Sequence, residues 1–139
     1  FVEDTSEMKR YTVKTNDLLM AGTGATAGII FIVPEKFNNL SFSYNAPRIR
    51  ATNAHHTFVY YYLKSDVILK QQKRLFVGNA QPFLDTDAMR GFKIDLPSIE
   101  EQQKIANFLS GIDTKIESVG NQITQTQIFK KGLLQQMFV

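Results

Sequence analysis

Near the C-terminal end of this chain lies an apolar repeat with alternating steps of four and three residues. Ten positions from residue 105 onward follow this spacing, and only Thr126 and Lys130 among them are polar. The other eight, which we call the apolar seam, are Ile105, Leu109, Ile112, Ile116, Val119, Ile123, Leu133 and Met137. This spacing keeps the seam on one narrow face, which a lone helix cannot bury. The pattern therefore predicts a helix that packs along a second helix.

The expected start of this helix is marked by Ser98 and Glu101, which lie three residues apart. In a capping box, the serine oxygen accepts a first-turn amide and the glutamate reaches back to the cap amide. About 38 helical residues would extend about 57 Å, which is longer than a domain of this size is wide. We therefore expect residues 98–139 to form an extended surface for a partner.

Residues 1–97 show a different pattern, in which short apolar segments alternate with turns. A chain of 139 residues with 43% hydrophobic content is sufficient for one folded core plus an appended helix. The segments predict strands at 17–21, 28–33, 40–44, 48–50 and 92–96, a loop at 34–39 and one helix over 57–76. The core residues expected from that helix are Phe58, Tyr61, Tyr62, Leu63, Val67, Ile68, Leu69 and Leu75. This mixture predicts an α+β fold, with a small mixed domain over 1–97 followed by a long coiled-coil-forming helix over 98–139.

The residues that carry most enzyme chemistry are sparse in this sequence. The absence of cysteine excludes disulfides and thiolate metal sites. His55 and His56 would point to opposite faces of an extended segment, so we interpret them as surface residues and not as metal ligands. Asp85 and Asp87 have no nucleophile nearby, and we interpret them as caps of a turn over 86–90. We predict no catalytic residue, no metal and no cofactor.

No apolar run approaches the roughly 18–20 residues that cross a bilayer, since the run at 29–33 has only the length of a strand. With neither cysteine nor a secretion-signal pattern in the sequence, we expect a cytoplasmic protein without membrane contact.

The basic excess lies entirely in residues 1–97, which carry 12 Lys and Arg against 9 Asp and Glu, whereas residues 98–139 carry 4 of each. This distribution favours an anionic partner for the first region. Lys70, Lys73 and Arg74 share one helical face, which is either a solvated stripe or a track for a phosphate backbone.

Two further motifs have both a structural and a nucleic-acid interpretation. The turn over 22–28 lacks the Gly-Lys-Ser/Thr ending of a nucleotide-binding loop, so a tight structural turn is favoured over a loop that contacts phosphate. The three tyrosines at 60–62 would point around a helix, where core packing is favoured over stacking on bases.

An ordered set of short motifs gives the chain a family resemblance. Leu-Pro at 96–97 leads into Glu-Gln-x-x-Ile at 101–105, an Ile-Asp step follows at 112–113, and Lys-Gly-Leu-Leu stands at 131–134. Upstream, in the same order as in the family, lie the segments 24–28, 62–63 and 78–84. Together these motifs resemble the specificity subunit of type I restriction–modification enzymes.

The resemblance implies a reader of DNA without catalytic activity. A subunit of this family normally carries two target recognition domains, each followed by a long helix, and the two helices pack antiparallel. Each domain reads half of a two-part target in the DNA major groove, while separate methyltransferase and restriction subunits modify and cleave. The present chain has one such domain, with a short first part, and one helix. It is therefore either a C-terminal fragment whose helix pairs with the other half, or a half-subunit that pairs with its own copy.

The resemblance and the side-chain chemistry together suggest where double-stranded DNA binds. We expect phosphate contacts from Lys9, Arg10, Lys73 and Arg74. We expect base-edge contacts from Arg48, Arg50, Asn79 and Gln81, because guanidinium and amide groups match the edges of guanine and adenine. The apolar seam is the expected dimerisation or partner-docking surface. The alternative is an assembly module that docks a partner through this helix and binds no DNA.

Overall fold

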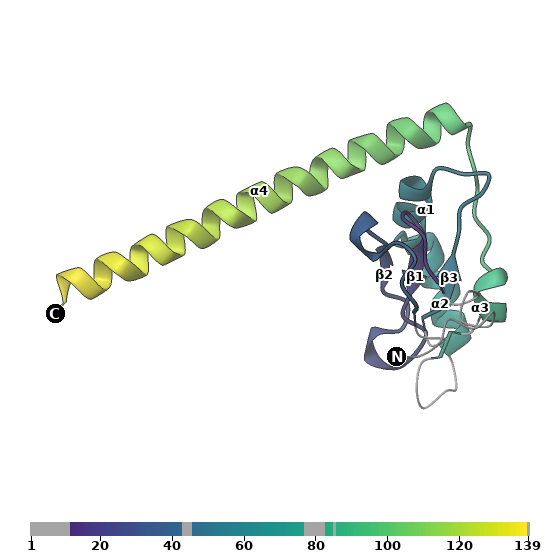
Figure 1. Ribbon diagram of the computed structural model, residues 1–139, viewed down its shortest axis with the longest axis horizontal. Coiled ribbons are helices and arrows are strands. Elements are labelled where there is room, and N and C mark those ends of the chain that lie inside the picture. The colour runs from purple at the N-terminus through teal and green to yellow at the C-terminus, as the bar shows by residue number, and fades with distance from the viewer. Residues whose placement is uncertain (1–11, 43–45, 77–82, 85, 139) are drawn as a thin grey trace. The chain divides into compact units, whose positions relative to one another are not determined.

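The computed structural model describes residues 12–42, 46–76, 83–84 and 86–138. The chain divides into two compact units, residues 1–103 and residues 104–139. The first unit contains three short strands and several short helices (Figure 1). The long helix α4 (Ile99–Met137) begins in the first unit and continues through the second as far as Met137. This combination is the α+β architecture that the sequence predicted.

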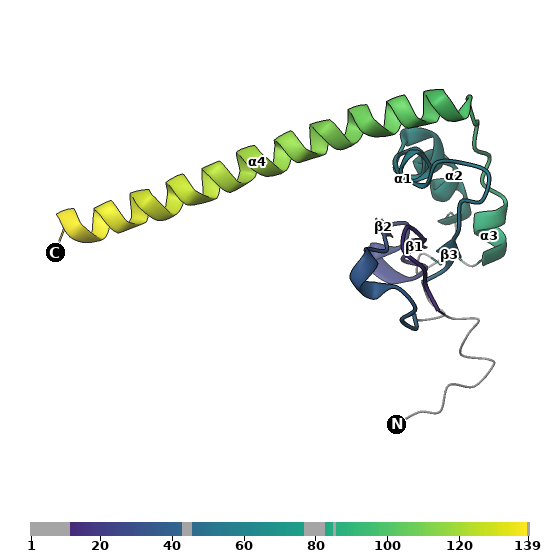
Figure 2. The ribbon, with the colours of Figure 1, turned by 45° about the horizontal axis from the view of Figure 1, so that its top comes forward.

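The sheet of the first unit has three antiparallel strands in the order β2-β1-β3 (Figure 2). These strands are β1 (Leu18–Met20), β2 (Ile30–Ile32) and β3 (Arg48–Ile49). Leu19 of β1 lies opposite Phe31 on one side and Arg48 on the other. All three lie within the strands predicted at 17–21, 28–33 and 48–50.

The central strand β1 is buried along its whole length. Leu18 and Met20 have no exposed surface and point to one face of the sheet. Leu19 points to the other face, where it packs in a cluster with Val13 and Val33. Since both faces are covered, the short strand carries apolar residues without the alternation of a half-buried strand.

The residues between β1 and β2 form the tight turn that the sequence predicted at 22–28. It contains the 3-10 helix η2 (Gly24–Thr26), and the N–H of Gly28 donates to the carbonyl of Ala21 at 2.8 Å. A second 3-10 helix, η3 (Glu35–Phe37), lies in the expected loop over 34–39. The strand predicted at 40–44 is wrong in its described part, residues 40–42, where only an isolated bridge joins Ser41 to Thr12.

The single helix predicted over 57–76 is wrong, because the structure has two helices, α1 (His56–Leu63) and α2 (Asp66–Phe76). The break falls at Lys64 and Ser65, where the Lys64 N–H bonds back to the end of α1 and the Ser65 carbonyl begins α2. The two helices pack together, and α1 contacts β2. The break changes which predicted core residues are buried. The buried ones are Phe58, Leu63 and Ile68, the half-buried ones are Tyr61 and Tyr62, and the exposed ones are Val67, Leu69 and Leu75.

After the short helix α3 (Thr86–Arg90), residues 92–96 form an extended connector and not the predicted strand. Side chains of α1 and α2 form hydrogen bonds with the backbone of the connector, as a neighbouring strand would in a sheet. Gln71 of α2 accepts from the Lys93 N–H at 3.0 Å and donates to the Lys93 carbonyl at 3.2 Å. Tyr62 of α1 accepts from the Asp95 N–H at 3.2 Å and donates to its carboxylate at 3.3 Å.

Helix α4 confirms the predicted long helix and the serine part of its expected capping box. The Ser98 hydroxyl accepts the Glu101 N–H at 3.3 Å. The pKa of Glu100 is lowered because its carboxylate accepts hydrogen bonds from its own backbone N–H and from the Ser98 side chain. The buried amide of Gln102 accepts from the His55 N–H at 2.9 Å and donates to the Pro97 carbonyl at 2.8 Å, so the first turn of α4 is bonded to the rest of the first unit. Among the described residues, no helix has the length and apolarity needed to span a bilayer.

Replacing Gly28 tests whether the turn needs glycine. Gly28 has a φ of +90°, and a Cβ there would lie 2.5 Å from Oε1 of Gln72, whose side chain is buried. We expect Gly28→Ala to lower the free energy of unfolding by about 1–3 kcal/mol, since this backbone conformation strains a residue with a Cβ. Tyrosine fluorescence during urea unfolding measures the effect, because all five tyrosines lie in the first unit.

Gly111→Ala in α4 is the matched control, because nothing lies within 4 Å of its added Cβ. We expect it to be neutral or to raise helix stability by about 0.5–1 kcal/mol, as measured by circular dichroism. Equal stability of Gly28→Ala and the unmodified chain would contradict the strain argument.

Candidate nucleic-acid interface

Arg50, a predicted base contact, forms an ion pair inside the first unit. Its Nε and Nη2 donate to the two carboxylate oxygens of Asp17, each at 2.7 Å. Asp17 precedes β1 and is 2% exposed, whereas the Arg50 side chain is 38% exposed. The Lys14 N–H also donates to Asp17, at 2.8 Å. This pair occupies two of the donors with which an arginine recognises guanine, so a base contact through them requires breaking it.

The pKa values of this pair move in opposite directions. Burial acts to raise the pKa of Asp17, but the hydrogen bonds from Arg50 and Lys14 and the nearby positive charge outweigh it, so that pKa is lowered. The hydrogen bond to Asp17 raises the pKa of Arg50. Both shifts favour the charged forms of the two side chains, as expected for an ion pair.

Arg48, the other predicted base-contacting arginine, is also held within the first unit. Its Nη1 donates to the carbonyl of Thr12, and its guanidinium carbon lies 5.6 Å from the ring centre of Phe42. With Ile49, Thr86 and Arg90, it lines a shallow hollow beside β3. Whether Arg48 or Arg50 contacts bases stays a prediction.

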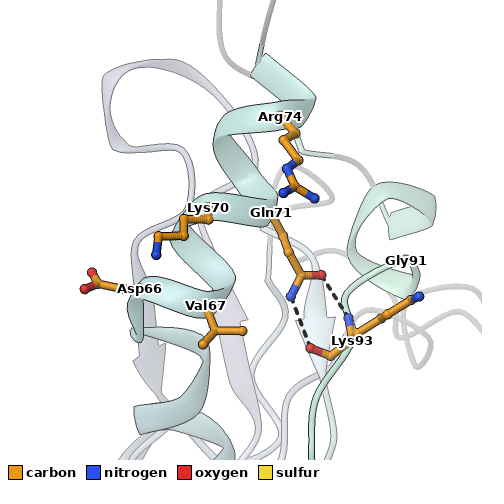
Figure 3. Close-up of a pocket in the computed structure, with 7 residues that line it drawn as sticks. All are labelled: Asp66, Val67, Lys70, Gln71, Arg74, Gly91 and Lys93. Carbon is orange, nitrogen blue, oxygen red and sulfur yellow. Dashed lines mark hydrogen bonds between the residues drawn. The ribbon is translucent and has the colours of Figure 1, made fainter.

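The basic residues of α2 lie beside a second hollow, of about 460 Å³. Figure 3 shows five lining residues from α2, Asp66, Val67, Lys70, Gln71 and Arg74, facing Gly91, which follows α3, and Lys93 of the connector. Sequence reasoning selected Arg74 but not Lys93, whose place depends on the hydrogen bonds from Gln71. The selected residue Lys73 is exposed but does not line this hollow. The remaining predicted contacts, Lys9, Arg10, Asn79 and Gln81, lie outside the described residues.

The two histidines do not point apart, contrary to the prediction. His55 is the residue directly before α1 and His56 is the first residue of the helix, and their rings stack with centres 4.9 Å apart. Burial, followed by the neighbouring His55, lowers the pKa of His56. Among the described residues, no three His, Asp or Glu side chains gather in the manner of a metal site.

The central part of the apolar seam is exposed in the single chain. Ile116 is 64% exposed, while Val119 and Ile123 are each 53% exposed. Long exposed apolar surfaces of this kind mark sites where a partner binds. The sequence predicted that a partner binds this surface, and in the structure of the single chain the central part of the surface is exposed.

Residues 2–126 match the family model described as the type I restriction modification DNA specificity domain. The chain belongs to this family. Over 139 residues it is 32% identical to the type I restriction enzyme MjaVIII specificity subunit of Methanocaldococcus jannaschii. That match covers 99% of this chain and 31% of the relative, so the chain spans about a third of the relative's length.

The solved structure of the HsdS subunit from Thermoanaerobacter tengcongensis shares the fold of this specificity domain. The TM-score is 0.65 and the sequence identity is 22%, over 78% of this chain and 28% of the other. The α+β fold and the family resemblance expected from the sequence are therefore both confirmed.

Replacing Asp17 tests the role of the ion pair in the specificity domain. We expect Asp17→Asn to lower the free energy of unfolding at pH 7 by about 2 kcal/mol, less than for a fully buried pair because Arg50 is partly exposed. The folded pKa of Asp17 is lowered, so the stabilisation is present above the ordinary value of about 3.9 and is lost as the pH falls through the lower folded value. Urea unfolding at several pH values should show the difference between the two proteins closing in acid.

Asp87→Asn serves as the control, because it removes an ion pair with Arg90 whose side chains are 84% and 76% exposed. We expect a change of less than about 0.5 kcal/mol. A difference for Asp17→Asn that persists unchanged into acid would exclude the ion pair as its cause.

Proposed function

We propose that this chain is a sequence-specific DNA-recognition module of a type I restriction–modification complex. Its first region, residues 1–97, reads one half of a two-part target in double-stranded DNA. Its second region, residues 98–139, pairs with another helix and docks the methyltransferase and restriction subunits. Catalysis resides in those partner subunits, and the module works in the cytoplasm without cofactor or metal.

The observation that carries this proposal is the family match over residues 2–126, which includes both the mixed domain and most of α4. The charge distribution supports it, because the basic excess lies in the region assigned to DNA. The assignment of phosphate contacts to Lys9, Arg10, Lys73 and Arg74 follows from this distribution. Arg48, Arg50, Asn79 and Gln81 are assigned to base edges.

The long helix supports the second half of the proposal. A continuous helix of 39 residues with an exposed apolar seam has the surface that a second helix requires. The polar interruptions at Thr126 and Lys130 favour one register over others at some cost in stability. Pairing of two such helices would set the distance between two recognition domains, and therefore between the two half-sites.

The exposed seam also favours the second candidate function, an assembly module that docks a partner and binds no DNA. In that case, the basic excess of the first region is incidental. DNA binding and its dependence on salt distinguish the two functions, because phosphate contacts release counterions and a purely apolar interface does not.

We expect the purified chain to bind double-stranded DNA with an affinity that falls steeply as salt rises. If each of the four proposed phosphate-contacting residues meets one phosphate, the logarithm of the binding constant should fall with the logarithm of salt with a slope of about −4. Fluorescence anisotropy of a labelled mixed-sequence duplex at several salt concentrations measures this slope.

Absence of salt-dependent binding would contradict the DNA-recognition proposal and favour the assembly module. The same preparation, incubated with DNA and a methyl donor, should neither methylate nor cleave the duplex. Either activity in the chain alone would contradict the assignment of catalysis to partner subunits.

Charges placed in the seam should prevent helix pairing. Ile112→Asp combined with Ile116→Asp puts two carboxylates on the face that must be desolvated in a coiled coil, so we expect the mass of a homodimer to fall to that of a monomer. Light scattering measures the mass, and circular dichroism checks that α4 remains helical.

Ile128→Asp combined with Phe129→Asp is the matched control. Both residues lie on α4 and are 67% exposed, but they fall off the four-and-three spacing of the seam. We expect this pair of substitutions to leave the mass unchanged. If it dissociates the dimer and the seam variant does not, the interface lies on another face of α4.

A further inference from the structure

The hollow between α2 and the connector has the charge of an anion-binding surface. Three cations line it, Lys70 and Arg74 from α2 and Lys93 from the connector, against the single carboxylate of Asp66. Among the described residues, none of these three cations forms an ion pair with a carboxylate. No carboxylate in the part of the chain that the structure describes neutralises them, whereas Asp17 neutralises Arg50.

The arrangement of the cations suits an extended anion more than a compact one. In Figure 3, Lys70 lies beside Asp66 on one side of Val67, while Arg74 lies with Gln71 on the side of the connector. The Lys93 side chain extends away from the other two. Cations that spread along a hollow, and do not gather at one point, suit an anion with several charges along its length, such as a nucleic-acid backbone.

Gln71 fixes the connector side of the hollow. Its amide makes two hydrogen bonds with the main chain of Lys93, at 3.0 and 3.2 Å, so the backbone of Lys93 is held against α2. Because the main chain is held and the side chain is exposed, Lys93 can present its ammonium group at the edge of the hollow.

We propose that this hollow binds the phosphate backbone of duplex DNA, with Lys70, Arg74 and Lys93 as phosphate contacts and Gln71 as the positioning residue for Lys93. The proposal rests on the DNA-recognition function proposed above and adds two contacts, Lys70 and Lys93, and the role of Gln71. Asp66 opposes binding, since its carboxylate stands at the same hollow and repels phosphate.

The test uses a mixed-sequence duplex, because phosphate contacts do not depend on base sequence. Lys70→Gln, Arg74→Gln and Lys93→Gln should each weaken binding and reduce the steepness of the salt dependence by about one phosphate contact. Asp66→Asn should act in the opposite direction and tighten binding by about two- to fivefold, an increase that loss of folding cannot produce.

Lys36→Gln is the control, since Lys36 is an exposed lysine of the first unit on η3, outside the hollow. We expect its salt slope to equal that of the unmodified chain. Tyrosine fluorescence on unfolding verifies that each variant remains folded.

Gln71→Leu tests the positioning role by a double-mutant cycle. It should weaken DNA binding in the unmodified chain but have no further effect when Lys93 is already Gln, because Gln71 acts through Lys93. Additive effects would overturn that role.

The outcomes separate this inference from the function on which it rests. If the unmodified chain shows no salt-dependent DNA binding, the proposed function fails and the hollow has no DNA partner. If the unmodified chain binds but the three substitutions leave the salt slope unchanged, the DNA-recognition function stands and the hollow is excluded as a contact site.

Discussion

Burial of β1 on both of its faces is the constraint on which the first unit depends. A strand of only three residues stabilises a sheet when every one of its side chains is buried, and Leu18, Leu19 and Met20 meet this condition. Its two edges are hydrogen-bonded to β2 and β3. The ion pair of Asp17 with Arg50 joins the residue before β1 to the residue after β3, so the strand's position is set by charge as well as by packing.

The sequence was most informative where a pattern repeats or where turn residues delimit it. Helix α4 followed from a spacing sustained over many turns, and its start from Ser98. The first two strands followed from apolar segments on either side of a glycine-rich turn. The break between α1 and α2 was missed because Lys64 and Ser65 are not helix breakers. The pair Ser65-Asp66 resembles a helix start, and this was the only available signal.

Contacts between residues far apart in sequence account for the other differences. The connector at 92–96 has the composition of a strand, but its partners are side chains of Gln71 and Tyr62, 22 and 33 residues away. No local pattern encodes such a pairing. Long-range contacts also explain why only part of the candidate site could be predicted from the sequence. The common face of Lys70 and Arg74 follows from helical periodicity, whereas the neighbouring position of Lys93 and the pairing of Arg50 with Asp17 require the fold.

The manner in which the connector is held has a consequence for how this surface can evolve. The two hydrogen bonds from Gln71 to residue 93 use the main-chain N–H and carbonyl of that residue, and every amino acid except proline supplies both groups. The architecture therefore places almost no demand on the identity of that side chain. Mutational drift at residue 93 can therefore change the charge at the edge of the hollow while the scaffold stays intact.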